Sequence, residues 1–162
     1  MLSPVAQFSQ MLEALSAILA KAEAHATAGK IAPEALLQAR LFPDMYTLTK
    51  QVQLACDFAA RACARLAGAE IRSFADTEVS FADLQARIRT ALDYIATFAP
   101  GLYADADNRS ITLKQQGGDR VMCGADYLAL FAQPHFFFHV TAAHCILRAK
   151  GIALGKSDFM GQ

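Results

Sequence analysis

The spacing of apolar residues along the chain predicts four long helices. In each of four stretches, apolar side chains recur every three or four residues, which places them on one face of a helix. Capping residues or proline precede several of these stretches and glycine follows several of them, as is typical of helix ends. The predicted helices cover about residues 4–28, 43–66, 81–98 and 126–150.

A different pattern precedes the last predicted helix. Residues 110–114 alternate apolar and polar side chains, residues 115–119 contain two glycines, and residues 120–123 form a second short run. This pattern predicts a β-hairpin, and because a lone hairpin is only marginally stable, we expect it to pack on the helices. The expected fold is therefore all-α, an antiparallel four-helix bundle with a small β-hairpin insertion, in which residues 1–162 form a single domain.

Two features of the last predicted helix are unusual. Pro134 lies in its middle and deletes a backbone hydrogen bond, so we expect a kink or a break there. Phe136, Phe137 and Phe138 cover nearly the whole helix circumference, which predicts a helix buried on every side, against its own domain or a second copy. The tail from residue 152 onwards is expected to be irregular.

The charge composition argues against a nucleic-acid partner. The 15 basic and 15 acidic side chains cancel, so the chain lacks the net positive charge that nucleic-acid binding requires. A net charge near zero permits self-association, and we expect a homodimer. The N-terminus lacks signal-peptide features and no apolar run suits a membrane span, so we expect a cytoplasmic protein without membrane contact. The four cysteines form no C-x-x-C pair and are expected to be reduced and mostly buried.

His135 and His139 are the residues with the clearest chemical potential. They lie four residues apart and therefore share a face of the last predicted helix. Helices use this H-x-x-x-H spacing to hold a transition metal, with a third ligand from another helix. Gln53 and Asp57 on the second long helix are the inward-facing candidates for metal or ligand binding, although Arg61 can pair with Asp57. Alternatively, the histidines form internal hydrogen bonds only.

Six short motifs carry a resemblance that spans nearly the whole chain. They are Leu41-Phe42-Pro43-Asp44-Met45, Gln51-Val52-Gln53-Leu54-Ala55-Cys56-Asp57, Phe74-x-Asp76-Thr77-Glu78, Pro134-x-Phe136-Phe137-Phe138-His139-Val140-Thr141, Ile146-Leu147-Arg148 and Gly155-Lys156-x-Asp158-Phe159. As a set they resemble an uncharacterised bacterial family of DinB/YfiT-like proteins. The resemblance implies an up-down-down-up four-helix bundle that is often dimeric.

The resemblance also implies a divalent-metal site. Better-known relatives hold the metal with three histidines, one on the second helix and an H-x-x-x-H pair on the last, and some are thiol-dependent transferases or isomerases. By position, the pair corresponds to His135 and His139, and the second-helix histidine corresponds to Gln53. The implied site for zinc, nickel or manganese is therefore degenerate, because glutamine replaces one of its three ligands.

Three functions remain open at this point. The first is a metal-dependent enzyme in which the metal activates a thiol or water. The second is a non-catalytic module that binds a small molecule through His135, His139 and Gln53. The third is a structural dimer whose histidines only form internal hydrogen bonds.

Overall fold

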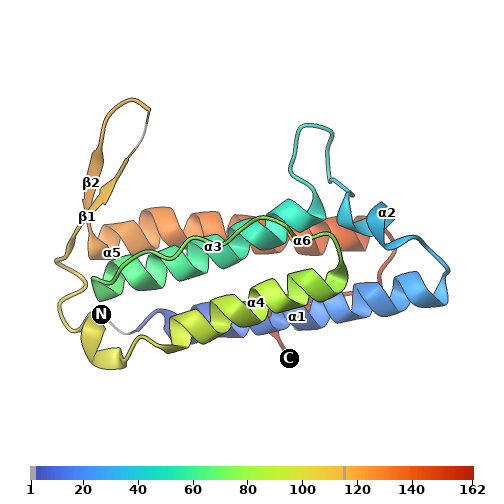
Figure 1. Ribbon diagram of the computed structural model, residues 1–162, viewed down its shortest axis with the longest axis horizontal. Helices are drawn as coiled ribbons and strands as arrows, with labels where there is room; N and C mark the ends of the chain where they lie inside the picture. Colours follow the sequence, from blue (N-terminus) through green and yellow to red (C-terminus); the bar gives the residue numbers. More distant parts are fainter. Residues whose placement is uncertain (1–2, 115) are drawn as a thin grey trace.

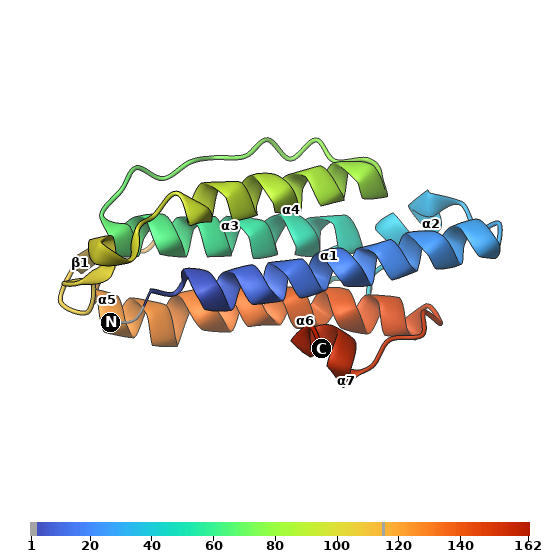
Figure 2. The same ribbon diagram turned by 90° about the horizontal axis from the view of Figure 1, so that it is seen from below.

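Four long helices form the body of the molecule. The computed structural model describes residues 3–114 and 116–162 and is mostly helical. The long helices lie side by side (Figures 1 and 2) and are α1 (Val5–Ala28), α3 (Leu48–Ala67), α4 (Phe81–Ala96) and α6 (Gln133–Ala149). α1 and α6 run in one direction and α3 and α4 in the other (Figure 1). The prediction of a mainly helical chain is confirmed.

Residues 68–80 connect α3 to α4 along the length of the molecule. Because these two helices run in the same direction, the connection has to return from the end of one to the start of the other (Figure 2). Gly68 ends α3 with a φ of 70°, in the left-handed region that glycine adopts readily. The connection therefore lies against the long helices, where its side chains can contact α3 and α4.

The beginnings of α3 and α4 are set by capping side chains. The Thr47 hydroxyl accepts a hydrogen bond from the Lys50 amide at 3.3 Å, so α3 begins at Leu48 and five residues later than predicted. Ser80 and Asp83 form a capping box at the start of α4. A short helix, α2 (Pro33–Leu37), precedes α3, and a 3₁₀ turn, η1 (Pro100–Tyr103), follows α4.

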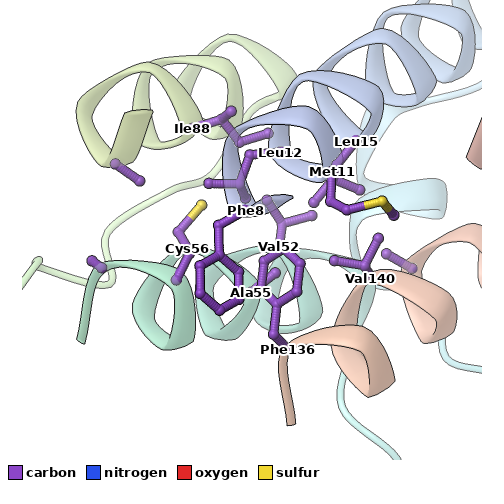
Figure 3. Packing of buried hydrophobic residues seen from close by; sticks show 14 of the residues in the cluster. Phe8, Met11, Leu12, Leu15, Val52, Ala55, Cys56, Ile88, Phe136 and Val140 are labelled. Carbon is purple, nitrogen blue, oxygen red and sulfur yellow. The ribbon is translucent and has the colours of Figure 1, made fainter. Parts of the chain in front are cut away.

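The core lies between the four long helices. Apolar side chains from all four meet there (Figure 3), among them Phe8 of α1, Val52 of α3, Ile88 of α4 and Phe136 of α6. The rings of Phe8 and Phe136 pack edge to face with centroids 4.8 Å apart, a favourable aromatic geometry. This packing fixes the rotation of α6 about its axis, which determines where the rest of that helix points.

The predicted hairpin is present. β1 (Ser110–Leu113) pairs antiparallel with β2 (Arg120–Cys123), with Ser110 opposite Cys123. Ile111, Leu113 and Met122 are buried, and the outer part of the hairpin extends away from the helices (Figure 1). Gln115, the first residue of the predicted turn, lies outside the described residues.

The last helical run is continuous through Pro134. α5 (Gly124–Tyr127) leads into a π-helical turn, η2 (Leu128–Ala132), and then into α6. The Gln133 amide bonds to the Leu128 carbonyl, five residues back, and both Ala132 and Gln133 keep right-handed helical dihedral angles. The expected break is therefore absent, and the local distortion at the proline takes the form of a π-helical turn just ahead of it.

Two further expectations concern α6 and the tail. Phe136 is fully buried, but Phe138 is 57% exposed, so this chain alone does not cover α6 on every side, and the predicted cover by a second copy stays a prediction. The tail is not wholly irregular, because it forms α7 (Lys156–Met160). Gln10 of α1 donates to the Met160 carbonyl at 3.0 Å and Lys21 pairs with Asp158, so α7 packs on α1. Within the described residues, no helix combines the length and the apolar character that a membrane span needs.

Candidate functional site

α6 presents its two histidines to different environments. His139 is 6% exposed, whereas His135, one turn earlier, is exposed. Both imidazole rings stack on Phe58 of α3, with ring centroids 4.6 Å away for His135 and 5.5 Å away for His139. Phe131 also packs against the His135 ring at 4.5 Å. Aromatic packing therefore holds both imidazoles at the contact between α6 and α3.

Gln51 is the polar partner of His139. Its side-chain oxygen lies 2.8 Å from Nδ1 of His139, and its amide nitrogen donates to the Tyr46 carbonyl at 3.3 Å. Burial and the neighbouring His135 lower the pKa of His139 to about 4, so its imidazole is neutral near pH 7. A neutral, hydrogen-bonded imidazole satisfies the requirement that a buried polar group has a partner.

A surface hollow of about 390 Å³ opens beside the two histidines. It is lined by Leu130, Pro134, His135, Phe138 and His139. The two imidazoles are the polar groups of this lining, and neither a carboxylate nor a cationic side chain contributes to it. The hollow is thus suited to a molecule with an apolar body and few polar groups.

Gln53 does not lie with the histidine pair. Its amide nitrogen donates to Glu78 at 2.7 Å, on the side of α3 that faces the connection between α3 and α4. Residues two apart on a helix point about 200° away from each other, so Gln51 and Gln53 cannot both face α6. The structure therefore places Gln51, and not Gln53, at the position from which α3 reaches His139.

Asp57 belongs to a buried ion cluster away from the hollow. One carboxylate oxygen accepts from Arg87 at 2.6 Å and the other from Arg61 at 2.7 Å, which confirms the predicted contact with Arg61. Arg87 is 4% exposed and also donates to Glu78 at 3.0 Å. Burial acts to lower the pKa of Arg87, but the charges of Asp57 and Glu78 raise it above its ordinary value.

This ion cluster holds the connection between α3 and α4. Arg87 donates to the Ala75 carbonyl at 3.0 Å and pairs with Asp76 at 3.3 Å, and Lys50 pairs with Asp76 at 2.6 Å. The Arg87 guanidinium also lies over the Phe74 ring, 4.8 Å from its centroid. The carboxylate of Asp57 thus has a structural partner on each oxygen, and Asp57 does not line the hollow beside the histidines.

The donor set does not fit a three-ligand metal centre. Within residues 3–114 and 116–162, no group of three or more His, Cys, Asp or Glu side chains is placed to hold a metal ion. His135 and His139 supply two nitrogens, and the Gln51 oxygen already bonds to His139. The three-histidine centre implied by the resemblance is therefore not reproduced by these side chains.

Two of the four cysteines are unsuited to nucleophilic chemistry. Cys56 and Cys63 are buried, and burial raises the pKa of each thiol to about 12. Such thiols stay protonated and inert at neutral pH. Cys145 is partly exposed and Cys123 is exposed, so the expected burial holds for two of the four cysteines.

Three residues of these two clusters escaped sequence reasoning. Gln51, Phe58 and Arg87 are not among the predicted site residues, although each is a polar or aromatic residue at a defined helix position. Gln51 and Phe58 are seven residues apart, two turns along one face of α3, which is the signal that pairs them. Arg87 directly precedes Ile88 in the buried stripe of α4, where a cation requires a buried anion.

Comparisons with known proteins identify the family. The sequence profile described as domain of unknown function DUF1993 matches residues 3–160. The crystal structure of a DinB family member protein from Shewanella denitrificans superposes with a TM-score of 0.91 at 37% sequence identity, covering 98% of this chain and 89% of that one. No curated protein matches the chain. The chain therefore belongs to the DUF1993 family, an uncharacterised family of DinB-like proteins.

Proposed function

We propose that the protein binds a small organic molecule in the hollow beside His135 and His139. The observation that carries this proposal is the environment of His139, a buried neutral imidazole at the edge of an apolar hollow. Only one of its ring nitrogens is bonded to Gln51. Ligand sites typically combine apolar walls with a few fixed polar groups, which is the composition of this lining.

The size and charge of the hollow define the ligand class. A volume of about 390 Å³ is in the range of small-molecule pockets and holds one aromatic bicycle or a molecule of similar bulk. Leu130, Pro134 and Phe138 supply apolar contact. Because no carboxylate, lysine or arginine side chain contributes to the lining, a charged ligand would find no opposite charge there, and a neutral ligand avoids that cost.

A divalent metal is the second candidate. Its support is the H-x-x-x-H spacing, which lets two imidazoles on one helix bind the same ion. Zinc, nickel or manganese bound in this way would take two nitrogens from His135 and His139 and complete its coordination with water or a ligand. The metal-assisted thiol chemistry implied by the resemblance requires a bound metal. We assign no step of that chemistry to the residues at this site.

One binding experiment separates the candidates. Protein purified without a histidine tag is treated with a chelator and then screened by thermal shift against aromatic fragments and, separately, against the three metals. We expect fragments to raise the Tm of the wild type, and His135→Phe to keep the stacking on Phe58 but weaken the effect. His144→Phe is the matched control, because His144 bonds to the Gly155 carbonyl outside the hollow. Stabilisation by metal alone would favour the second candidate, and no stabilisation by either would favour a structural role.

We further propose the DinB arrangement and a homodimer. The directions of α1, α3, α4 and α6 support an up-down-down-up four-helix bundle. Several large apolar side chains are exposed in η2, in α6 and in the segment just before α3, which supports a self-association surface: Leu41, Phe42, Tyr46, Leu130 and Phe138. Leu130 and Phe138 also line the hollow, so a dimer built there would cover the ligand site.

A further inference from the structure

The hydrogen-bond chain behind His139 has a fixed direction. Gln51 is 1% exposed, and its side-chain amide lies between the Tyr46 carbonyl and the His139 ring. A carbonyl oxygen can only accept, so the nitrogen end of the amide has to face Tyr46. The oxygen end then faces His139, where it can only accept a hydrogen bond from Nδ1 at 2.8 Å.

The Gln51 oxygen, a hydrogen-bond acceptor that faces Nδ1, determines the tautomer of the imidazole. In the neutral ring, one nitrogen carries the hydrogen and the other carries a lone pair. Because the Gln51 oxygen cannot donate, Nδ1 of His139 carries the hydrogen and Nε2 carries the lone pair. The ring is buried, and burial favours the neutral form of an imidazole over the charged form.

The lone pair on Nε2 is available to a ligand. Nε2 has no hydrogen bond within residues 3–114 and 116–162. In that part of the chain, Arg87 Nε is the one fully buried side-chain nitrogen or oxygen without a partner, so Nε2 keeps contact with accessible space. The accessible space that His139 borders is the hollow it shares with His135.

We infer that Gln51 holds His139 as the Nδ1–H tautomer, so that the hollow binds molecules presenting a hydrogen-bond donor, N–H or O–H, on a neutral apolar body. This inference rests on the proposed function for its ligand, although the tautomer itself does not depend on any ligand. Gln51 acts here as a positioning residue, because it determines which ring nitrogen of His139 carries the hydrogen without itself touching the hollow. A molecule that offers only an acceptor would face the lone pair of Nε2 and be disfavoured.

The first test determines the tautomer directly. Chelator-treated protein labelled with ¹⁵N-histidine is studied at pH 7 by long-range ¹H–¹⁵N correlation NMR, which distinguishes protonated from unprotonated ring nitrogens. We expect His139 to show a protonated Nδ1 and an unprotonated Nε2, opposite to the form that free histidine favours in water. A protonated Nε2 in the wild type would overturn the inference, whatever binds in the hollow.

Two matched variants test the role of Gln51. Gln51→Leu removes the acceptor, so we expect the Nε2–H form of His139 to become populated. Gln53→Leu removes a glutamine from the same helix whose amide bonds to Glu78, and we expect it to leave the tautomer unchanged. If Gln51→Leu does not fold, the wild-type spectrum still decides the tautomer. A Gln51→Leu protein that keeps an unprotonated Nε2 would show that Gln51 does not set it.

The second test compares ligands of one shape. Indole, benzofuran and 1-methylindole are titrated separately, and the His139 ring resonances report binding. Indole has an N–H donor, benzofuran has an oxygen in its place, and 1-methylindole has a methyl group. We expect indole to bind about fivefold more tightly than benzofuran, as one net hydrogen bond would give. Equal or tighter binding of benzofuran would overturn the ligand preference.

The two tests separate this inference from the proposed function. If none of the three probes binds while His139 shows the Nδ1–H form, the proposed ligand site is refuted and the role of Gln51 stands. If the three probes bind with equal affinity whether or not they carry an N–H donor, the ligand site stands and the inferred preference for a donor is refuted.

Discussion

Acidification from pH 8 to pH 5 is expected to weaken the fold through one side chain, His139. Burial and the neighbouring His135 lower the pKa of His139 to about 4, whereas an unfolded histidine titrates near 6.5. Between these two values, the unfolded chain binds a proton that the folded chain does not. The free energy of unfolding is therefore unaffected by this residue above about pH 7 and falls as the pH decreases from 6.5 towards 4.

The difference between the two pKa values sets the magnitude. Each unit of difference is worth about 1.4 kcal/mol when the pH lies below both values. At pH 5 the unfolded histidine is almost fully protonated and the folded one is not, so His139 lowers the free energy of unfolding by about 2 kcal/mol relative to pH 8. Asp76 and Asp83 have pKa values below the ordinary range and titrate beneath this window.

Urea unfolding at pH 8, 6 and 5 measures this effect. His139→Asn is the informative variant, because asparagine offers an N–H donor to Gln51 but does not titrate. We expect the wild-type free energy of unfolding to fall by about 2 kcal/mol more than that of His139→Asn over this range. His144→Asn is the control and is expected to follow the wild type. Parallel curves for wild type and His139→Asn would refute the assignment of a buried, neutral His139.

Four further substitutions test other parts of the structure. Arg87→Met leaves Asp57 without its buried partner and is expected to lower the free energy of unfolding by about 3 to 5 kcal/mol, as measured by urea unfolding. Arg61→Met removes a half-exposed cation from the same carboxylate and is expected to cost at most about 1 kcal/mol. Thr47→Ala removes the cap of α3 and is expected to cost about 1 kcal/mol in the same assay. Phe138→Ser is expected to convert a dimer to a monomer in sedimentation, and an unchanged sedimentation coefficient would contradict the proposed interface.

Helices were predictable from the sequence because their apolar stripes are local. A stripe at helical spacing depends only on neighbouring residues, so the positions of α1, α4 and α6 followed from it. The start of α3 was less predictable. Pro43 and Asp44 resemble a helix start, but the hydroxyl that caps the helix belongs to Thr47, and the choice between such sites depends on tertiary contacts.

The partner of the histidine pair was not predictable from local pattern. Gln51 and Gln53 are both buried glutamines in α3, and α3 packs against α6 on one side and α4 on the other. Which glutamine faces α6 depends on the rotation of α3, which its whole set of core contacts decides. Gln53 reaches Glu78, 25 residues later, only because the connection returns along the molecule.

The anionic partners of Arg87 were likewise not predictable from the local pattern. Its anionic partners come from α3 and from the connection before α4, and they lie 30 residues (Asp57) and 9 residues (Glu78) away in sequence. Within α4, helical spacing places Arg87 in the buried stripe but does not show which anions it meets. Long-range packing therefore converts an ordinary arginine into the centre of a buried ion cluster.

A crystal structure of the protein soaked with indole would show directly whether the hollow binds a donor-bearing aromatic molecule. We expect ring density in the hollow between Leu130, Phe138 and the two histidines, with the indole nitrogen within hydrogen-bonding distance of Nε2 of His139 and Gln51 still bonded to Nδ1. A His139 ring turned so that Nδ1 leaves Gln51, or indole bound only elsewhere on the molecule, would contradict it.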